Sequence, residues 1–214
     1  MNLVAGLGNP GSRYETTRHN AGFLVVDELV RRWNGTLKKD RFGSLSGDAL
    51  IRNNKVHLAK PQKFMNRSGA PLRGLLDYFG GDAASLIVVH DEVDLPFGTI
   101  RIKQSGGHGG HNGLRDIHKH VGSNAYARVR FGVGRPPEGW DTADYVLGRW
   151  SADEAFALDS HVATAADAVE TIIEYGLEAA MNQFHVREKS GKAARPTVDD
   201  SQSFRAPMAY GVSL

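Results

Sequence analysis

Short apolar runs alternate with amphipathic stretches along most of this 214-residue chain. Runs with the length and composition of β-strands occur at residues 3–7, 45–51, 56–60, 86–90, 99–103 and 127–133. The run LIVVH is apolar up to its final histidine and rich in β-branched side chains, which is typical of a central parallel strand covered on both faces. A turn at Asn53-Asn54 would join the second and third strands.

The stretches between these runs have the spacing of amphipathic helices. The first helix would be capped by Asn20 and would end at Asn34-Gly35, and further helices are expected at residues 68–79, 113–120 and 177–186. The longest follows a capping box, Ser151-x-x-Glu154, and would end at Gly176. Its expected apolar stripe consists of Phe156, Leu158, Val162, Ala166, Val169 and Ile173.

Strands that alternate with helices, with no internal repeat and no linker, predict an α/β fold. We expect a single domain over residues 1–187, with a twisted, mixed but mostly parallel central sheet and helices on both faces. Residues 188–214 are rich in lysine, glycine, serine and proline, which predicts a flexible C-terminal tail. Ligands of such sheets bind beyond the carboxyl ends of the parallel strands. Asn9 and Asp91 each follow such a strand and should face the same crevice.

The composition excludes several classes of site. The chain has no cysteine, which rules out disulfides, thiolate catalysis and zinc or iron–sulfur sites held by cysteine. It has no signal-peptide pattern and no apolar run of the ~18 residues that a membrane span needs. The sequence therefore predicts a cytoplasmic protein without a membrane segment.

Charge is distributed unevenly, although the net charge is only +2. Residues 99–137 contain seven lysines and arginines and one acid, whereas residues 138–178 contain ten acids and one arginine. This asymmetry suggests a basic face for a polyanion and an acidic, solvated back, although ordinary surface charge is an alternative explanation.

The glycine pattern Gly6-x-Gly8-x-x-Gly11 superficially matches a dinucleotide-binding fingerprint. That fingerprint needs a helix beginning at the turn and an acid about 20 residues later at the end of the next strand. Here Pro10 interrupts the turn, a polar loop follows, and the nearest acids lie inside the first predicted helix. The pattern instead favours a rigid turn that presents Asn9 at a strand end.

His19 and Asp91 are the candidate catalytic pair. A histidine titrates near neutral pH, and a hydrogen-bonded carboxylate can orient its ring and raise its basicity. Glu92 and Asp94 are alternative partners on the sequence alone. Asn9, Asn66 and Asn112 stand where strands or loops lead into helices, so they could cap helices or could bind peptide groups and a developing oxyanion.

A metal site is an alternative for the histidines. His108-x-x-His111 lies in a glycine loop, and a metallohydrolase could use these two residues with His90, although no third ligand stands at a standard spacing. The chain has neither a GxSxG nucleophile motif nor a GxxxxGK[ST] phosphate loop. By elimination, the residues favour direct attack of a histidine-activated water on an acyl centre.

Five motifs in this order resemble those of the bacterial peptidyl-tRNA hydrolase family: GLGNPGSRYETTRHNAG, FMNRSG, HDEVDLP, GGHGGHNG and RVRFGVGRP. The resemblance extends from about residue 2 to residue 187 and departs at Ser105, where a glycine is expected. It implies a monomeric α/β hydrolase, without metal or cofactor, that cleaves the ester between a peptide and the 3′ ribose of tRNA.

The resemblance also implies roles for individual residues. His19 would be the catalytic histidine and Asp91 its partner, while Asn9 would fix the geometry of the site. Asn66 and Asn112 would hold the peptide main chain and the attacked carbonyl or water.

Other matched residues would bind the two halves of the substrate. Tyr14, Met65 and His111 would line the crevice, and Lys103 and Arg130 would bind phosphates of the tRNA. The expected partner is therefore peptidyl-tRNA, contacted at its acceptor stem, 3′ end and nascent peptide. RNA-binding splicing cofactors share this fold without needing hydrolysis, and this alternative stays open.

Overall fold

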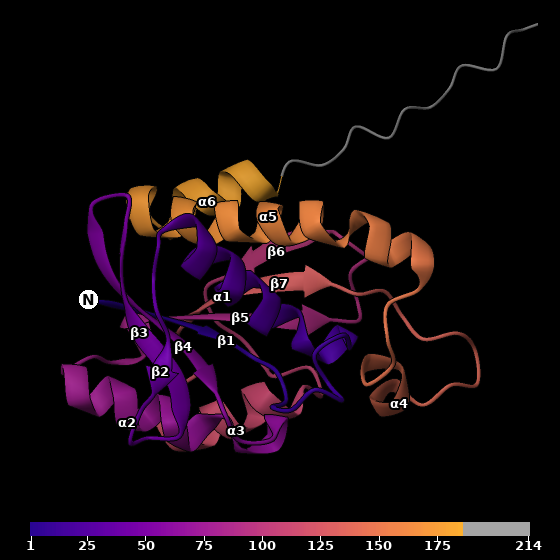
Figure 1. Ribbon diagram of the computed structural model, residues 1–214, viewed down its shortest axis with the longest axis horizontal. Coiled ribbons are helices and arrows are strands. Elements are labelled where there is room, and N and C mark those ends of the chain that lie inside the picture. The colour runs from indigo at the N-terminus through magenta and orange to yellow at the C-terminus, as the bar shows by residue number, and fades with distance from the viewer. Residues whose placement is uncertain (186–214) are drawn as a thin grey trace, which may run out of the picture.

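The computed structural model describes residues 1–185, which contain one seven-stranded sheet (Figure 1). Its spatial order is β2-β3-β4-β1-β5-β7-β6. The strands are β1 (Asn2–Gly6), β2 (Lys38–Lys39), β3 (Ser44–Ile51), β4 (Asn54–Pro61), β5 (Leu86–Glu92), β6 (Ile100–Lys103) and β7 (Ala127–Gly132). The central strands β4, β1, β5 and β7 are parallel, and β2, β3 and β6 are antiparallel to their neighbours. The predicted mixed, mostly parallel sheet is confirmed.

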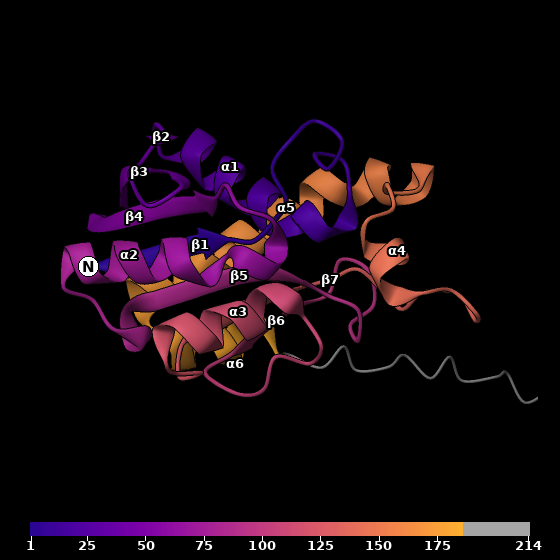
Figure 2. The same ribbon diagram turned by 90° about the horizontal axis from the view of Figure 1, so that it is seen from below.

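Helices cover both faces of the sheet, as expected. They are α1 (Ala21–Arg32), α2 (Gly69–Phe79), α3 (Asn112–Val121), α4 (Thr142–Val146), α5 (Ala152–Tyr175) and α6 (Leu177–Phe184). Helices α1, α5 and α6 lie on one face and α2 and α3 on the other, while α4 stands beyond the end of the sheet (Figures 1 and 2). None of the described helices combines the length and hydropathy of a membrane span.

The central strands contribute alternate side chains to two separate cores. On β5, Ile87 and Val89 join the core beneath α1 and α5, whereas Leu86 and Val88 join the core beneath α2 and α3. This two-sided burial explains the nearly unbroken apolar run in the sequence. The strand continues through Asp91 and Glu92, so the carboxylate of Asp91 is held on regular backbone rather than on a loop.

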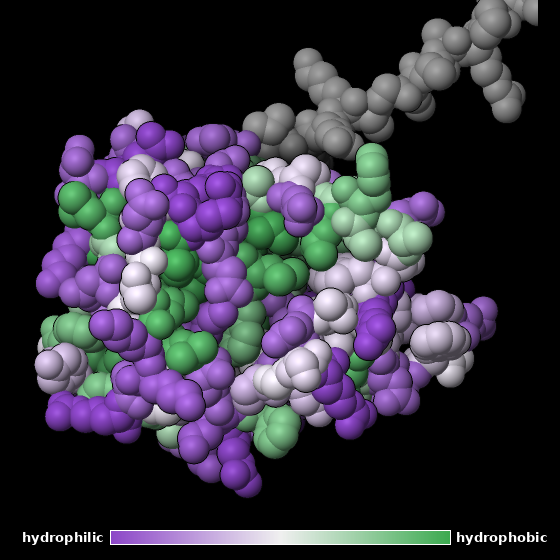
Figure 3. Space-filling view, viewed as in Figure 1, coloured by the Kyte–Doolittle hydropathy of each residue, from purple (hydrophilic) through white to green (hydrophobic). Residues whose placement is uncertain are grey.

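The expected stripe on α5 is wrong at its first position. The capping box forms as predicted, because Ser151 Oγ accepts a hydrogen bond from Glu154 N (3.2 Å) and Glu154 Oε2 accepts one from Ser151 N (2.7 Å). Phe156, however, is 93% exposed. The first turns of α5 extend past the sheet, which leaves apolar atoms uncovered at this end of the helix (Figures 1 and 3).

Other differences are local. The turn between β3 and β4 is made by Arg52 and Asn53, both with positive φ, rather than by Asn53-Asn54. The short elements β2 and α4 were not predicted, because two and five residues carry too little periodicity to be recognised. The predicted tail at residues 188–214 lies outside the described residues.

Candidate active site

The site forms where β1 and β5 end side by side. Leu7 N donates a hydrogen bond to Val89 O (2.9 Å) just beyond the paired part of β1. The chain then crosses the glycine turn and a polar loop, and returns through a 3-10 turn (Arg18–Asn20) into α1. Gly22 allows this return, because a Cβ there would overlap the backbone of both Leu7 and Val89. The first turn of α1 therefore packs directly on the two strand ends.

His19 and Asp91 meet across this junction. His19 Nδ1 lies 2.9 Å from both carboxylate oxygens of Asp91, and both residues are buried. Burial opposes protonation of His19, but the charge and hydrogen bond of Asp91 outweigh it, so the pKa of His19 is raised above 6.5. Burial by itself would raise the pKa of Asp91, yet the two neighbouring imidazoles hold it well below its usual range. Asp91 is thus a charged acceptor that keeps the Nδ1 proton of His19 and leaves Nε2 as the lone-pair atom.

His111 is a second donor to the same carboxylate. Its Nδ1 accepts hydrogen bonds from Gly113 N (3.1 Å) and Leu114 N (3.3 Å), where it caps α3. The proton must therefore be on Nε2, which lies 3.0 Å from Asp91 Oδ1. The tautomer of His111 is fixed by backbone geometry, and Asp91 is oriented from two sides.

His90 is buried beside this group but differs in chemistry. Its Nδ1 donates to the backbone oxygen of Asp91 (2.7 Å). Complete burial and the neighbouring His111 lower the pKa of His90 to about 3. His90 therefore stays neutral at physiological pH and supports the strand end that carries Asp91.

Asn9, in the glycine turn, connects this turn to two other segments, which contain Asn20 and Met65. Its Oδ1 accepts a hydrogen bond from Met65 N (2.7 Å), and its backbone N–H and oxygen bind the side chain of Asn20 (2.8 and 2.9 Å). Asn20 occupies the N-cap position of α1 as predicted, but its side chain makes no capping hydrogen bond, because its amide is bound to Asn9 instead. The sequence offered no sign of this pair, since an asparagine before a helix usually serves as a cap.

A cavity of about 660 Å³ opens in front of these residues. The eight predicted catalytic and substrate-binding residues all line it: Asn9, Tyr14, His19, Met65, Asn66, Asp91, His111 and Asn112. Asn66 and Asn112 are exposed at its rim, where Asn112 Oδ1 accepts a hydrogen bond from Arg115 Nη1 (3.1 Å).

The apolar part of the cavity wall was not predicted. It is formed by Phe64, Val93, Ala143, Val146 and Leu147, of which the last three belong to α4 or directly follow it. The weak periodicity of this segment gave no sequence signal for its place in the site.

The metal hypothesis gains little from this geometry. Among residues 1–185, the side chains whose ligand atoms converge within 4.8 Å are His19, Asp91 and His111. The alternative group of His90, His108 and His111, all within the same described residues, does not converge in this way. Both imidazole atoms facing Asp91 donate protons to it, and His111 cannot release its proton without losing two backbone contacts. Metal ligation needs lone pairs at these positions, so the donor set suits a hydrogen-bonded network better.

Comparisons with known proteins identify the family of this chain. A family model described as peptidyl-tRNA hydrolase matches residues 3–193. The chain belongs to the peptidyl-tRNA hydrolase family. It is 50% identical over 184 residues to the peptidyl-tRNA hydrolase of Rhodococcus erythropolis and 48% identical over 190 residues to that of Kineococcus radiotolerans. Each alignment covers 86% of this chain, and 97% and 96% of the respective relatives.

Solved structures of the family share the fold. The peptidyl-tRNA hydrolase of Acinetobacter baumannii superimposes with a TM-score of 0.81 at 39% identity, covering 87% of this chain and 95% of that one. The suspected family and the hydrolase class are thereby confirmed, whereas the roles of individual residues stay predictions.

Lys103 and Arg130, which the family resemblance assigns to phosphate binding, do not line the cavity. Lys103 on β6 is exposed and pairs in register with Arg128 on β7, and Arg101 pairs with Arg130. Residues opposite each other and two apart share a face, so Lys103, Arg101 and Arg130 form one basic surface. Arg128 lies on the same face but is buried, and its Nη1 donates to Gly107 O (2.9 Å). Arg130 Nε is bound to Glu92 Oε2 (2.9 Å), which partly neutralises this surface on the side of the site.

Proposed function

We propose that this chain hydrolyses the ester bond of peptidyl-tRNA, releasing a peptide and free tRNA. The relatives named above are peptidyl-tRNA hydrolases. The observation that carries the proposal is the buried pair of His19 and Asp91, which opens on a cavity lined by amide side chains.

The proposed reaction begins with water bound beside His19. Nε2 takes a proton from this water as its oxygen attacks the ester carbonyl, and Asp91 stabilises the imidazolium that forms. The tetrahedral intermediate then expels the ribose 3′ oxygen, which takes the proton back from His19. One well-placed general base contributes ~10²–10⁴-fold in rate. The amides of Asn66 and Asn112 at the rim can donate to the oxyanion, at ~10²–10³-fold per donor.

The remaining predicted residues would hold this arrangement or the substrate. His111 keeps Asp91 oriented, and Asn9 ties the glycine turn to Met65. Tyr14 packs edge-on against Phe64 at one side of the cavity, with ring centroids 6.3 Å apart, which suits contact with the peptide. No step of this mechanism needs a cofactor or metal, and a monomer contains all of its residues.

The tRNA would lie over the basic surface of β6 and β7. Lys103 is exposed there and would bind a phosphate, while Arg130 would exchange its contact with Glu92 for one with RNA. Such contacts release counterions and make affinity fall with salt. They leave the cavity open for the peptide end of the substrate.

The test is release of N-acetyl-amino acid from N-acetyl-aminoacyl-tRNA by the purified protein, compared with His19→Asn. His57→Asn is a matched control, because His57 also bonds an aspartate (Asp48, 2.7 Å) but lies on β4 away from the cavity. We expect loss of cleavage in His19→Asn alone, unchanged by a chelator. A wild-type protein that binds RNA but never cleaves the ester would refute the proposal and favour the splicing-cofactor alternative.

A further inference from the structure

The apolar wall of the cavity rests on an element with little support of its own. Helix α4 has only five residues, and isolated helices of this length are unstable in water. It stands beyond the end of the sheet, outside the two main layers of helices (Figures 1 and 2). Ala143, Val146 and Leu147 nevertheless reach the cavity from this segment. Val146 is buried in the core beneath α1 and α5, but the two ends of the segment need further support.

Arg18 supplies that support. Its Nη1 donates to Arg149 O (2.7 Å) just after α4, and its Nη2 donates to Glu154 Oε2 (2.6 Å) at the start of α5. The backbone joins in, because Arg18 N donates to Gly148 O (3.2 Å) and Thr17 forms an isolated bridge with Arg149. The 3-10 turn that carries His19 is thus fastened to both ends of the connection between α4 and α5.

The guanidinium is also enclosed. Arg18 is only 9% exposed, and its Cζ lies 4.4 Å from the ring centroid of Tyr145 in α4. Tyr145 in turn donates through its hydroxyl to Val133 O (2.8 Å). A Cβ at Gly148 would press against Arg18 Nη1, so the chain leaves room for the guanidinium. A planar side chain that both stacks and donates in two directions fits this place, and lysine would not reproduce it.

From these contacts we infer that Arg18 is a positioning residue, which fixes the apolar wall of the cavity where the acyl group of the substrate binds. The inference rests on the proposed function. The two consecutive residues have different partners. The side chain of His19 points to Asp91, and that of Arg18 points to α4 and α5. The general base and the wall that faces the acyl group are therefore fixed to each other by one dipeptide. The wall binds the side chain of the esterified amino acid, and its position determines which side chains bind well.

Loosening Arg18 should therefore affect substrates unequally. A leucine esterified to the tRNA would lose side-chain contacts with Val146 and Leu147, whereas an esterified glycine has no side chain and makes no such contacts. Discrimination by an apolar pocket amounts to ~10–200-fold, so the expected effect is about tenfold at the low end of that range. A purely structural role would instead lower the amount of folded enzyme and reduce the rates for both substrates by the same factor.

The experiment compares N-acetyl-leucine and N-acetyl-glycine esterified to the same tRNA. In Arg18→Lys, we expect KM for the leucyl ester to rise about tenfold and KM for the glycyl ester to change less than about twofold. Glu154→Gln is the second variant, and should shift the ratio in the same direction. Its amide oxygen can still accept the capping hydrogen bond from Ser151, so α5 is preserved. This variant keeps the inference testable if Arg18→Lys does not fold.

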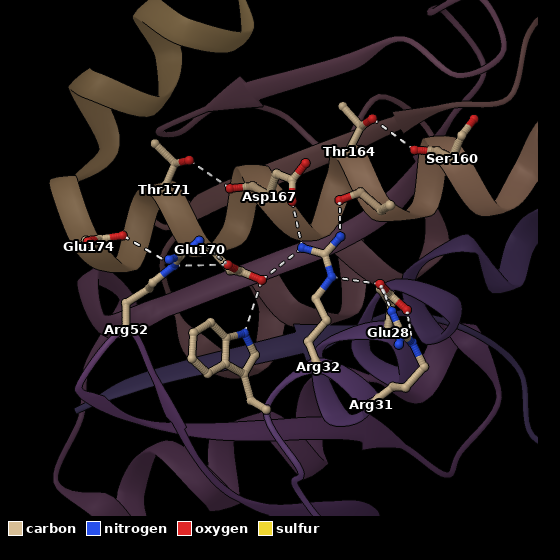
Figure 4. Close-up of polar contacts among 12 residues, drawn as sticks. Glu28, Arg31, Arg32, Arg52, Ser160, Thr164, Asp167, Glu170, Thr171 and Glu174 are labelled. Carbon is tan, nitrogen blue, oxygen red and sulfur yellow. Dashed lines mark hydrogen bonds and ion pairs between the residues drawn. The ribbon is translucent and has the colours of Figure 1, made fainter.

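Arg32→Lys is the matched control. Arg32 is likewise partly buried and binds carboxylates, with Asp167 and Glu170 on α5 (2.6 and 2.9 Å) and Glu28 on its own helix (Figure 4). It sits at the opposite end of α1 from His19 and should leave the leucyl-to-glycyl ratio unchanged.

An equal change for both esters in Arg18→Lys, or the same selectivity in Arg32→Lys, would overturn the inference. Failure of the wild-type protein to cleave either ester would instead refute the proposed function.

Discussion

Replacing Asp91 by asparagine should make the reaction slower and at the same time more resistant to acid. The general base must be unprotonated, so the rate falls on the acid side with the pKa of His19, which Asp91 keeps above 6.5. At the contact observed, with Nδ1 2.9 Å from both oxygens, the two charge centres lie about 4 Å apart. An effective dielectric of ~20 gives an attraction of about 4 kcal/mol between them, which burial opposes.

Asparagine removes the charge and leaves the burial. The pKa of His19 should then fall below 6.5, because burial lowers it and no neighbouring charge opposes that effect. The orientation of the new amide also follows from the structure. His111 must donate from Nε2, so the amide oxygen turns toward His111 and the NH₂ group toward His19. His19 Nδ1 becomes an acceptor, its proton moves to Nε2, and the lone pair needed for catalysis is lost. We expect the plateau rate to fall ~10²–10⁴-fold.

The assay is kcat/KM for N-acetyl-aminoacyl-tRNA from pH 4.5 to 9. Asp48→Asn is the control, because Asp48 bonds His57 Nδ1 (2.7 Å) far from the cavity and should change neither the plateau nor the midpoint. An acid limb in Asp91→Asn that stays in place or moves to higher pH would refute the assignment of His19 as a base coupled to Asp91.

Three further changes test other parts of the structure. Lys103→Ala should raise KM for tRNA substrates and reduce the salt slope of binding by about one, with kcat and cleavage of a minimal ester unchanged. Gly22→Ala should lower the free energy of unfolding by about 1–3 kcal/mol in urea titrations, whereas Gly107→Ala, with open space around it, should not. His90 is buried in its neutral form with a pKa of about 3, so the unfolded chain binds one more proton than the folded chain below pH 6.5. The free energy of unfolding should therefore fall by about 1.4 kcal/mol per pH unit between pH 6.5 and about pH 3. His90→Asn should flatten this slope.

The sequence predicted elements whose period and length are well defined. The apolar run of β5 and the helical spacing of α1, α2 and α5 were enough to give the sheet and its layers, because buried faces impose a period on the side chains. The exposure of Phe156 could not be predicted, since periodicity shows which face of a helix is apolar but not where the sheet beneath it ends. Helix α4 was missed for the related reason that it is shorter than two turns.

The candidate site could be predicted from the sequence only in part. That Asn9 and Asp91 face one crevice follows from the rule for strand ends. His19 and Asp91 were a candidate pair on their chemistry, and the resemblance to a known family favoured Asp91 over Glu92 and Asp94. The second bond from His111 to Asp91 depends on a backbone cap at the start of α3, which no residue pattern records. Asn20 stands at the predicted N-cap position without a side-chain cap, because the same amide can bind a helix end or a distant loop, and only the tertiary structure decides between them.

The parallel pairing of β1 with both β4 and β5 has a consequence for how the protein folds. Asn9 and His19 are separated from Asp91 and His111 by most of the first half of the chain, and they meet only when β1 is inserted between its two neighbours. Parallel pairings between distant segments close long loops and form slowly. In refolding experiments, esterase activity should therefore return later than the helical circular dichroism signal. The delay would show that the contacts around β1 are among the last to form.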